Sequence, residues 1–221
     1  MRAVLFDMDG TIADTSRGVF RCLGKVFDAM DIKVPEGFSL RKCIGPPLSY
    51  TFPVYFGLDR EDTARAEKLF RQEYYASGVY ECELFEGMKE CVAEVKRRGY
   101  FTTVASSKPE VMCQKILKQF GIEELFDVVA GADPERHIDT KEEVLYDLFG
   151  RISDIKKEDM LLVGDSIFDA EGAKNTGIKC LAVEYGFGDA DDMVKSGAVG
   201  KVGTTAEIPD AVDEYLKKRG D

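Results

Sequence analysis

Two carboxylates follow an apolar run near the amino terminus, and their close spacing could serve to bind a cation or to catalyse proton transfer. Asp7 and Asp9 are two residues apart in the segment "AVLFDMDGT", and Gly10 directly follows Asp9. In extended backbone, side chains two apart point to the same side of the chain. Carboxylates held so close repel each other, unless a divalent cation neutralises them or one keeps its proton and acts as an acid. A simple polar turn is the alternative, because Asp and Gly are common turn formers.

The strand expected before these carboxylates would place them where ligands bind. Residues 3–6 are all apolar, which is typical of a strand in a parallel sheet covered on both faces. Asp7 then lies at the carboxyl end of that strand, and loops leaving this end of an α/β sheet converge on a ligand-binding crevice. Gly10 allows a sharp exit, and Asp14 or Thr15 could cap a following helix.

A second pair of acidic residues follows a strand in the carboxyl-terminal half. The apolar segment 160–163 precedes "GDSIFDAEGA", in which Asp165 and Asp169 are four apart. If this strand lies beside the first one, three or four carboxylates share a crevice, and such oxygen-rich sites bind Mg²⁺. Alone, the segment could be only a helix start, with Asp165 or Ser166 as the cap. Together with the first pair it favours a metal site, with Asp165 as a direct ligand and Asp169 as its supporting partner.

Two further segments carry groups that could hold an anion. Ser106, Ser107 and Lys108 follow the predicted strand 100–105, and hydroxyls with backbone amides at a helix start can bind phosphate. A routine helix cap is the alternative. Lys141 opens a predicted helix, where its charge opposes the helix dipole. This position indicates a functional placement, with a solvated lysine as the alternative.

Composition limits the class of protein. The chain has 221 residues, enough for one sizeable core with a smaller inserted domain. A formal net charge of −11 argues against a broad nucleic-acid-binding surface, because such surfaces are basic. We predict no signal peptide and no membrane-spanning segment, and the scattered cysteines without a CxxC pair are typical of reduced, structural thiols. We therefore expect a cytoplasmic protein, monomeric or homodimeric, that binds neither nucleic acid nor membrane.

The order of helical and strand patterns predicts an α/β fold. Residues from about 16 to 80 look wholly helical, and from Met88 onward helices and strands alternate. This alternation indicates a parallel sheet joined by right-handed crossovers. We predict a Rossmann-like core of residues 1–15 and 82–221, with residues 16–81 inserted as an all-helical cap over the end of the first strand. The predicted strands are 3–6, 100–105, 126–130, 160–163 and 180–183, and the predicted helices are 16–30, 39–44, one starting near 47, 59–77, 88–98, 110–120, 140–150, 167–176 and 209–219.

Taken together, the four motifs resemble the haloacid dehalogenase superfamily, specifically its phosphatase branches with a small helical cap. The matching residues are "DMDGT" at 7–11, Ser106 of "ASSKP", Lys141 of "DTKEEVLYDL" and Asp165 of "GDSIFDAEGA". They occur in the family's order over nearly the whole chain. The segments "CIGPPL" and "IKCLAVEYGFG" further resemble phosphoglycolate phosphatases and related 5'-nucleotidases.

This resemblance implies a phosphomonoesterase that works through a covalent intermediate. Asp7 would attack phosphorus and become an aspartyl-phosphate. Asp9 would protonate the leaving alcohol and then activate the hydrolytic water. Ser106 and Lys141 would hold the phosphoryl oxygens. The catalytic residues implied by the resemblance are therefore Asp7, Asp9, Ser106 and Lys141.

The same resemblance implies Mg²⁺ as the cofactor. It would be held by the Asp7 carboxylate, the backbone carbonyl of Asp9 and Asp165, with Asp169 bound through water or supporting the other ligands. A carboxylate attacks a phosphate dianion poorly because both are negative, so the cation and Lys141 would have to offset that repulsion.

Substrate choice is expected to lie with the cap, which would cover the leaving group. A carboxylate on the leaving group would need a cation, and a nucleoside would need an apolar slot, for which Phe20, Tyr50 and Phe52 are available. Each basic residue of the cap could equally be a solvated surface charge. The residues predicted to bind substrate are Ser106, Ser107, Lys141, Gly10, Arg17, Arg41 and Gly45, with Lys42 as a further candidate.

The leading expectation is therefore a phosphoglycolate phosphatase-like enzyme, with a 5'-nucleotidase as the alternative. Phosphoryl transfer to an acceptor other than water also stays open. A third possibility is a protein that binds a phosphorylated ligand without turning it over. Such a binder would have no need of Asp9, which argues against it.

Overall fold

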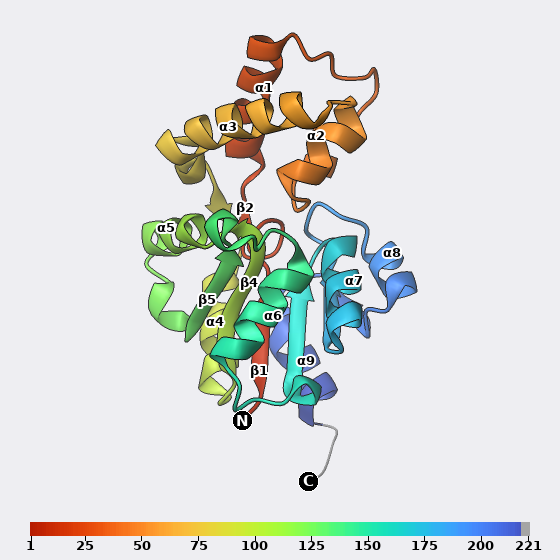
Figure 1. Cartoon of the computed structure of the whole chain (residues 1–221). Helices are drawn as coiled ribbons and strands as arrows, with labels where there is room; N and C mark the ends of the chain where they lie inside the picture. The colour runs from red at the N-terminus through yellow and green to blue at the C-terminus, as the bar shows by residue number, and fades with distance from the viewer. Residues whose placement is uncertain (218–221) are drawn as a thin grey trace.

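The computed structural model describes residues 1–217, whose centre is a six-stranded parallel sheet (Figure 1). The strand order is β5-β4-β1-β6-β7-β8. The central strand β1 (Ala3–Phe6) pairs in parallel with β4 (Phe101–Pro109) on one side and β6 (Met160–Gly164) on the other. The predicted α/β fold class is confirmed. The remaining strands of this sheet are β5 (Val128–Ala132), β7 (Lys179–Val183) and β8 (Gly200–Val202).

Helices cover both faces of the sheet, which explains why β1 has no polar alternation. Val4 and Phe6 belong to one buried cluster, and Ala3 and Leu5 belong to the other. The first cluster includes side chains of α4 (Met88–Arg97), α5 (Glu110–Phe120) and α9 (Ile208–Lys217). The second includes side chains of α6 (Lys141–Arg151), α7 (Ile167–Thr176) and α8 (Ala190–Ser196). Each face of the strand is therefore in apolar surroundings.

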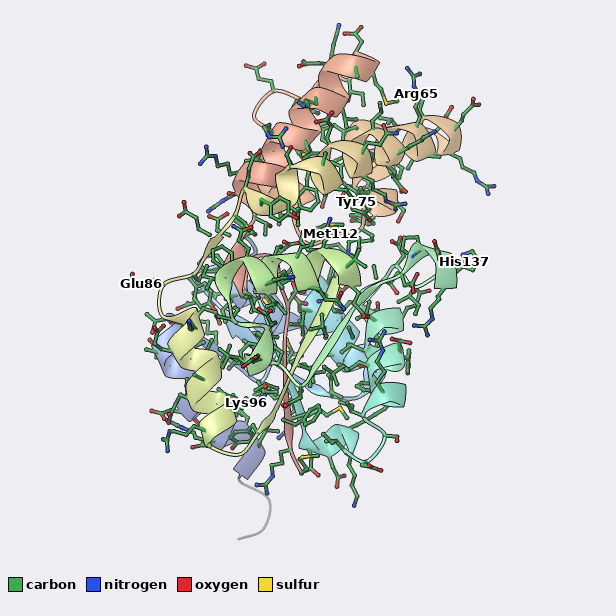
Figure 2. The ribbon with its side chains drawn as sticks, turned by 90° about the vertical axis from the view of Figure 1, so that its left-hand side faces the viewer. Arg65, Tyr75, Glu86, Lys96, Met112 and His137 are labelled. Carbon is green, nitrogen blue, oxygen red and sulfur yellow. The ribbon has the colours of Figure 1, made fainter. Side chains whose placement is uncertain are left out.

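Three helices that follow β1 in the chain lie above the carboxyl ends of the strands (Figure 1). They are α1 (Ser16–Met30), α2 (Leu48–Phe56) and α3 (Arg60–Ala76), which we call the cap helices. Tyr75 lies on the side of α3 that faces the core, above Met112 of α5 (Figure 2). The chain enters and leaves this layer through a short antiparallel pair, β2 (Ala13–Asp14) and β3 (Glu83–Leu84).

Several elements differ from the sequence prediction. The expected helix at 39–44 is only a 3-10 turn, Leu40–Cys43, ahead of the "GPP" segment. The β2–β3 pair, α8 and β8 were not predicted, because two- or three-residue strands and a seven-residue polar helix are too short to show a period. The predicted closing helix begins at Ile208, and its last two residues, 218 and 219, lie outside the described residues. Within residues 1–217, no helix is long and apolar enough to cross a membrane.

Candidate active site

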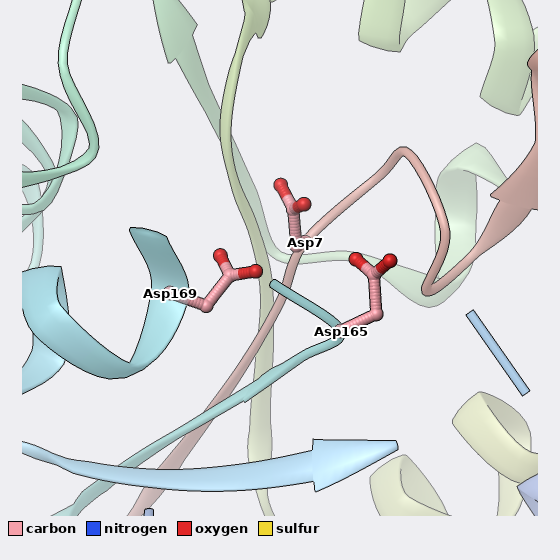
Figure 3. Close-up of side chains that lie close together, drawn as sticks. All are labelled: Asp7, Asp165 and Asp169. Carbon is pink, nitrogen blue, oxygen red and sulfur yellow. The ribbon is translucent and has the colours of Figure 1, made fainter. Parts of the chain in front are cut away.

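Three buried carboxylates meet at the carboxyl edge of the sheet (Figure 3). Asp7 and Asp165 directly follow strands β1 and β6, and Asp169 lies on helix α7. Asp7, Asp165 and Asp169 each offer an oxygen, and these oxygens lie within 4.8 Å of one another. The strands β1 and β6 are neighbours, so residues directly after them are brought together as the sequence predicted. Burial, only partly offset by Lys141, raises the pKa of Asp7 to about 6. Burial and then the charges of Asp169 and Asp7 raise the pKa of Asp165 well above its usual value.

Two oxygens of this group, Asp169 Oδ1 and Asp165 Oδ1, have no hydrogen-bond partner among the described residues. Lys141 Nζ forms an ion pair with Asp169 Oδ1 at 2.8 Å. Asp165 Oδ2 accepts a hydrogen bond from the backbone N–H of Phe187 at 2.7 Å, but Asp165 Oδ1 is buried and has no hydrogen-bond partner among the described residues. Buried polar atoms are nearly always satisfied, so this oxygen needs an explanation. A hard cation held by carboxylate oxygens would satisfy it, and the donor set fits Mg²⁺.

Gly10 packs directly against this acidic group. A Cβ built at Gly10 would lie 2.1 Å from Asp165 Oδ2, and the residue has a positive φ of 79°. Only glycine fits both the space and the backbone angle without strain. Gly10 was predicted among the substrate-binding residues, and the structure places it against Asp165 instead.

Lys141 neutralises part of the acidic group. Its Nζ lies 2.7 Å from Asp7 Oδ1 and 2.8 Å from Asp169 Oδ1, and it donates to the carbonyl oxygen of Ala105 at 2.8 Å. Burial opposes its charge, but Asp169 and Asp7 together raise the pKa of Lys141 above its ordinary value. The start of helix α6 therefore holds a lysine because its ammonium faces two carboxylates. Thr140 supplies the helix cap.

Asp9 is separate from the acidic group although it is only two residues from Asp7. Thr15 Oγ1 donates to Asp9 Oδ1 at 2.6 Å, and Lys108 Nζ lies 2.9 Å from Asp9 Oδ2. Thr15 therefore binds Asp9 instead of capping α1, while the Asp14 side chain accepts from the first backbone N–H of that helix. Lys108 was not predicted as a site residue. The only signal for it in the sequence is its position two residues after Ser106.

The two serines of "ASSKP" lie at the end of β4 beside these groups. Ser106 is buried, and its Oγ accepts from the backbone N–H of Lys108 at 3.2 Å. It directly follows Ala105, whose carbonyl oxygen accepts a hydrogen bond from Lys141, so Ser106 and Lys141 lie at the same end of β4. Ser107 is half-buried and faces a cavity under the cap helices.

That cavity has a volume of about 80 Å³ and lies between the strand ends and the cap helices. Its polar lining comes from Asp9, Ser107, Lys108 and Asp139 of the core and from Arg71 of α3. Arg71 was not predicted. The rest of the lining is mostly apolar and includes Val19, Ile44, Gly45, Pro46, Pro47, Leu48, Phe70, Tyr74 and Tyr75.

Of the predicted cap contacts, Gly45 lines the cavity and the two arginines do not. Arg17 is exposed and lines a separate hollow, because the buried face of α1 begins with Gly18 and Val19 and leaves residue 17 outside. Arg41 is also exposed, with its guanidinium carbon 5.7 Å from the ring centroid of Phe187.

The three aromatic residues proposed for an apolar slot also lie away from this cavity. Phe52 is fully buried in the apolar core, and Phe20 packs against that core. Tyr50 packs edge-on against Phe168 of α7, with the ring centroids 5.4 Å apart. The apolar part of the cavity is formed by other side chains.

A family model described as haloacid dehalogenase-like hydrolase matches residues 4–183, which include all four motifs. The chain belongs to this family. The prediction that the chain belongs to this family is confirmed, and so is the prediction that it is a phosphatase. The chain is 31% identical over 190 residues to a 5'-nucleotidase of Pseudomonas aeruginosa, covering 86% of each chain. It is 32% identical over 211 residues to the tyrosine-protein kinase PtkA of Mycobacterium tuberculosis, covering 95% of this chain and 72% of that one.

The fold of this haloacid dehalogenase-like hydrolase also matches solved structures. A predicted phosphatase from Clostridium acetobutylicum superimposes with a TM-score of 0.91 at 30% identity, covering 96% of this chain and 98% of that chain. The likeness therefore extends over the cap helices as well as the sheet.

Proposed function

We propose that this family member is a Mg²⁺-dependent phosphomonoesterase that forms an aspartyl-phosphate on Asp7. The observation that carries the proposal is the group of three buried carboxylates, each with an oxygen within 4.8 Å of the others, next to a buried lysine. Among the described residues, Asp165 Oδ1 of this group has no donor. Buried like charges are costly unless a counter-charge is present, so this arrangement suits a cation. When bound, Mg²⁺ would supply positive charge that offsets the repulsion between the nucleophile and a phosphate ester.

Residues of the chain can supply the nucleophile and the hydrogen bonds to the phosphoryl group. Lys141 fixes one oxygen of Asp7 at 2.7 Å, which leaves the other oxygen to attack phosphorus in line with the leaving group. Ser106, next to the carbonyl that binds Lys141, would donate to a phosphoryl oxygen. A positioned donor of this kind contributes about 10²- to 10³-fold in rate.

Asp9 is suited to proton transfer because its carboxylate is not part of the acidic group and lines the cavity. From there it would protonate the leaving oxygen while the phosphoryl group moves to Asp7. It would then take a proton from the water that hydrolyses the intermediate. General acid–base catalysis of this kind contributes about 10²- to 10⁴-fold.

The cavity favours a small leaving group. Its volume of about 80 Å³ is well below the roughly 300–1,000 Å³ typical of sites for larger ligands. Arg71 at its wall could pair with a carboxylate, although it already bonds Glu67 at 2.9 Å. These features support a phosphoglycolate-like substrate as the first choice.

Two observations favour further reactions at the same site. Identity to the Pseudomonas 5'-nucleotidase and the largely apolar cavity wall favour a nucleoside monophosphate as the second candidate. Identity to PtkA favours a test for transfer of the phosphoryl group to a hydroxyl other than that of water. The same Asp7 intermediate would serve in both reactions.

The test is a Mg²⁺-dependent phosphate-release screen against phosphoglycolate, nucleoside monophosphates, sugar phosphates and pyrophosphate, read as kcat/KM. Asp7→Asn should abolish release and Asp28→Asn, an exposed change on α1, should leave it unchanged. Adding alcohols or a tyrosine peptide and searching for phosphorylated product separates transfer from hydrolysis. Near-wild-type turnover by Asp7→Asn would refute the nucleophile assignment.

A further inference from the structure

Lys108 is a buried lysine at the end of β4 to which the proposed chemistry gives no role. Its side chain is 5% exposed, and its Nζ lies 2.9 Å from Asp9 Oδ2. Thr15 Oγ1 donates to the other oxygen of Asp9 at 2.6 Å. Because each oxygen has its own donor, the Asp9 carboxylate is held in one orientation from two sides.

The cap covers the other side of Lys108. The ammonium lies 4.5 Å from the centroid of the Tyr74 ring, and Tyr74 is itself buried. Tyr74 stacks on Phe70, with centroids 5.4 Å apart and ring planes at 12°, and both residues belong to α3. A desolvated ammonium is attracted to the face of an aromatic ring. Lys108 is therefore held between a carboxylate of the core and a ring of the cap.

This placement pairs the Lys108 ammonium with a carboxylate and keeps it away from water. A buried charge is tolerated when it is paired, and the pair is strongest when water is kept away. If α3 moved away from the core, water would reach Lys108 and weaken its attraction to Asp9.

We propose that Lys108 is a positioning residue that fixes the Asp9 carboxylate at the leaving group, and that Tyr74 makes this hold depend on closure of the cap. The inference rests on the proposed function, in which Asp9 protonates the leaving alcohol. Lys108 transfers no proton itself. It acts by holding Asp9, so its removal should matter most for esters whose leaving group needs a proton.

Two esters separate this role from a general electrostatic effect. The leaving group of phosphoglycolate needs a proton, whereas the dinitrophenolate of 2,4-dinitrophenyl phosphate does not. For Lys108→Met we expect kcat on phosphoglycolate to fall by about 10²-fold, within the range for a lost general acid. The first-turnover burst of dinitrophenolate should be unchanged. Lys108→Arg should restore part of the loss, and Lys118→Met, an exposed change on α5, should behave as wild type.

The cap's part is tested at Tyr74. Tyr74→Phe keeps the ring over the ammonium and should keep the wild-type ratio of rates on the two esters, while Tyr74→Leu should show the same dependence on the ester as Lys108→Met, to a smaller extent. Equal slowing of the first turnover of both esters by Lys108→Met, or unchanged rates for Lys108→Met on both, would overturn the inference. Equal rates for Tyr74→Leu and Tyr74→Phe would remove the link to the cap.

A crystal structure of Lys108→Met gives a readout that needs no activity. We expect the Asp9 carboxylate to leave its present orientation on Thr15. An unmoved carboxylate would refute the positioning role whatever the rates are. If the wild-type enzyme hydrolyses neither ester, the proposed function fails, and this structure still decides whether Lys108 positions Asp9.

Discussion

Replacing Asp165 with asparagine should stabilise the protein in EDTA and remove its response to Mg²⁺. Asp165 Oδ1 has no hydrogen-bond partner among the described residues, and the Asp165 carboxylate has an oxygen within 4.8 Å of oxygens of Asp7 and Asp169. Coulomb's law with an effective dielectric constant of about 20 gives about 3.5 kcal/mol of repulsion for two unit charges at that distance. Lys141 and proton uptake offset part of this, so we expect a gain of about 1 to 3 kcal/mol in the unfolding free energy of Asp165→Asn.

The assay is thermal unfolding in EDTA and in Mg²⁺ at pH 8. For a chain of this length, a gain of about 2 kcal/mol raises Tm by about 4 to 8 °C. Mg²⁺ at about 100 times its Kd should stabilise the wild type by about 2.7 kcal/mol and should not stabilise the variant. An asparagine oxygen can still accept from the Phe187 N–H, so the comparison changes the charge and keeps that hydrogen bond.

The unfolding free energy of the protein in EDTA should also depend on pH in a definite direction. Because the folded-state pKa values of Asp7 and Asp165 are raised, the folded metal-free protein holds more protons than the unfolded chain between the ordinary and the raised values. Its unfolding free energy therefore falls as pH rises through that window, to near pH 6 for Asp7. The advantage of Asp165→Asn in EDTA should shrink when the pH is lowered to about 5.

Asp169→Asn is the matched control, because the same substitution four residues away should act in the opposite direction. Asp169 pairs with Lys141 at 2.8 Å and accepts from the N–H and hydroxyl of Ser166 at 3.0 and 2.7 Å. Its removal leaves part of a buried positive charge uncompensated, so it should lower Tm in EDTA. The reasoning fails if Asp165→Asn is less stable than the wild type in EDTA, or if it still gains stability from Mg²⁺.

Three further predictions concern single residues. Lys141→Met should lower kcat by about 10²- to 10³-fold and cost about 3 to 5 kcal/mol in urea unfolding, because it leaves two buried carboxylates without their lysine. Gly10→Ala should weaken Mg²⁺ binding by at least about tenfold in calorimetry. Gly177→Ala, whose φ of 80° is similar but whose Cβ would meet nothing within 4 Å, should not weaken it. Arg71→Met should raise KM for phosphoglycolate by about tenfold and leave KM for a neutral aryl phosphate unchanged, with Arg17→Met, outside the cavity, as control.

Strong local patterns predicted much of the fold. The helices α1, α5 and α7 begin and end at the residues expected from the spacing of their apolar side chains. Gly121 and Gly177 end two of them with a positive φ, which is a common way for a helix to stop. The carboxylates after β1 and β6 were placed together because parallel neighbours end at the same edge of the sheet.

Contacts that depend on the tertiary fold could not be predicted in this way. Lys108 follows two serines at a strand end, where it looks like an ordinary residue before a helix, and only the fold brings Asp9 and Tyr74 against it. Arg71 pairs with Glu67 four residues earlier, which alone suggests a surface salt bridge. The position of α3 over the sheet makes Arg71 part of the cavity wall.

The different surroundings of Asp7 and Asp9 explain how two neighbouring carboxylates can do different work. Asp7 is bound by Lys141 from α6 and shares the acidic group, an arrangement that suits a nucleophile next to a cation. Asp9 is bound by Lys108 from β4 and by Thr15, and its oxygens are kept out of that group. The two lysines lie in different segments, so each can be changed without removing the other. Loss of Lys141 should therefore slow attack on every ester. Loss of Lys108 should slow the first step only for esters whose leaving group requires a proton, and it should slow hydrolysis of the intermediate for all of them.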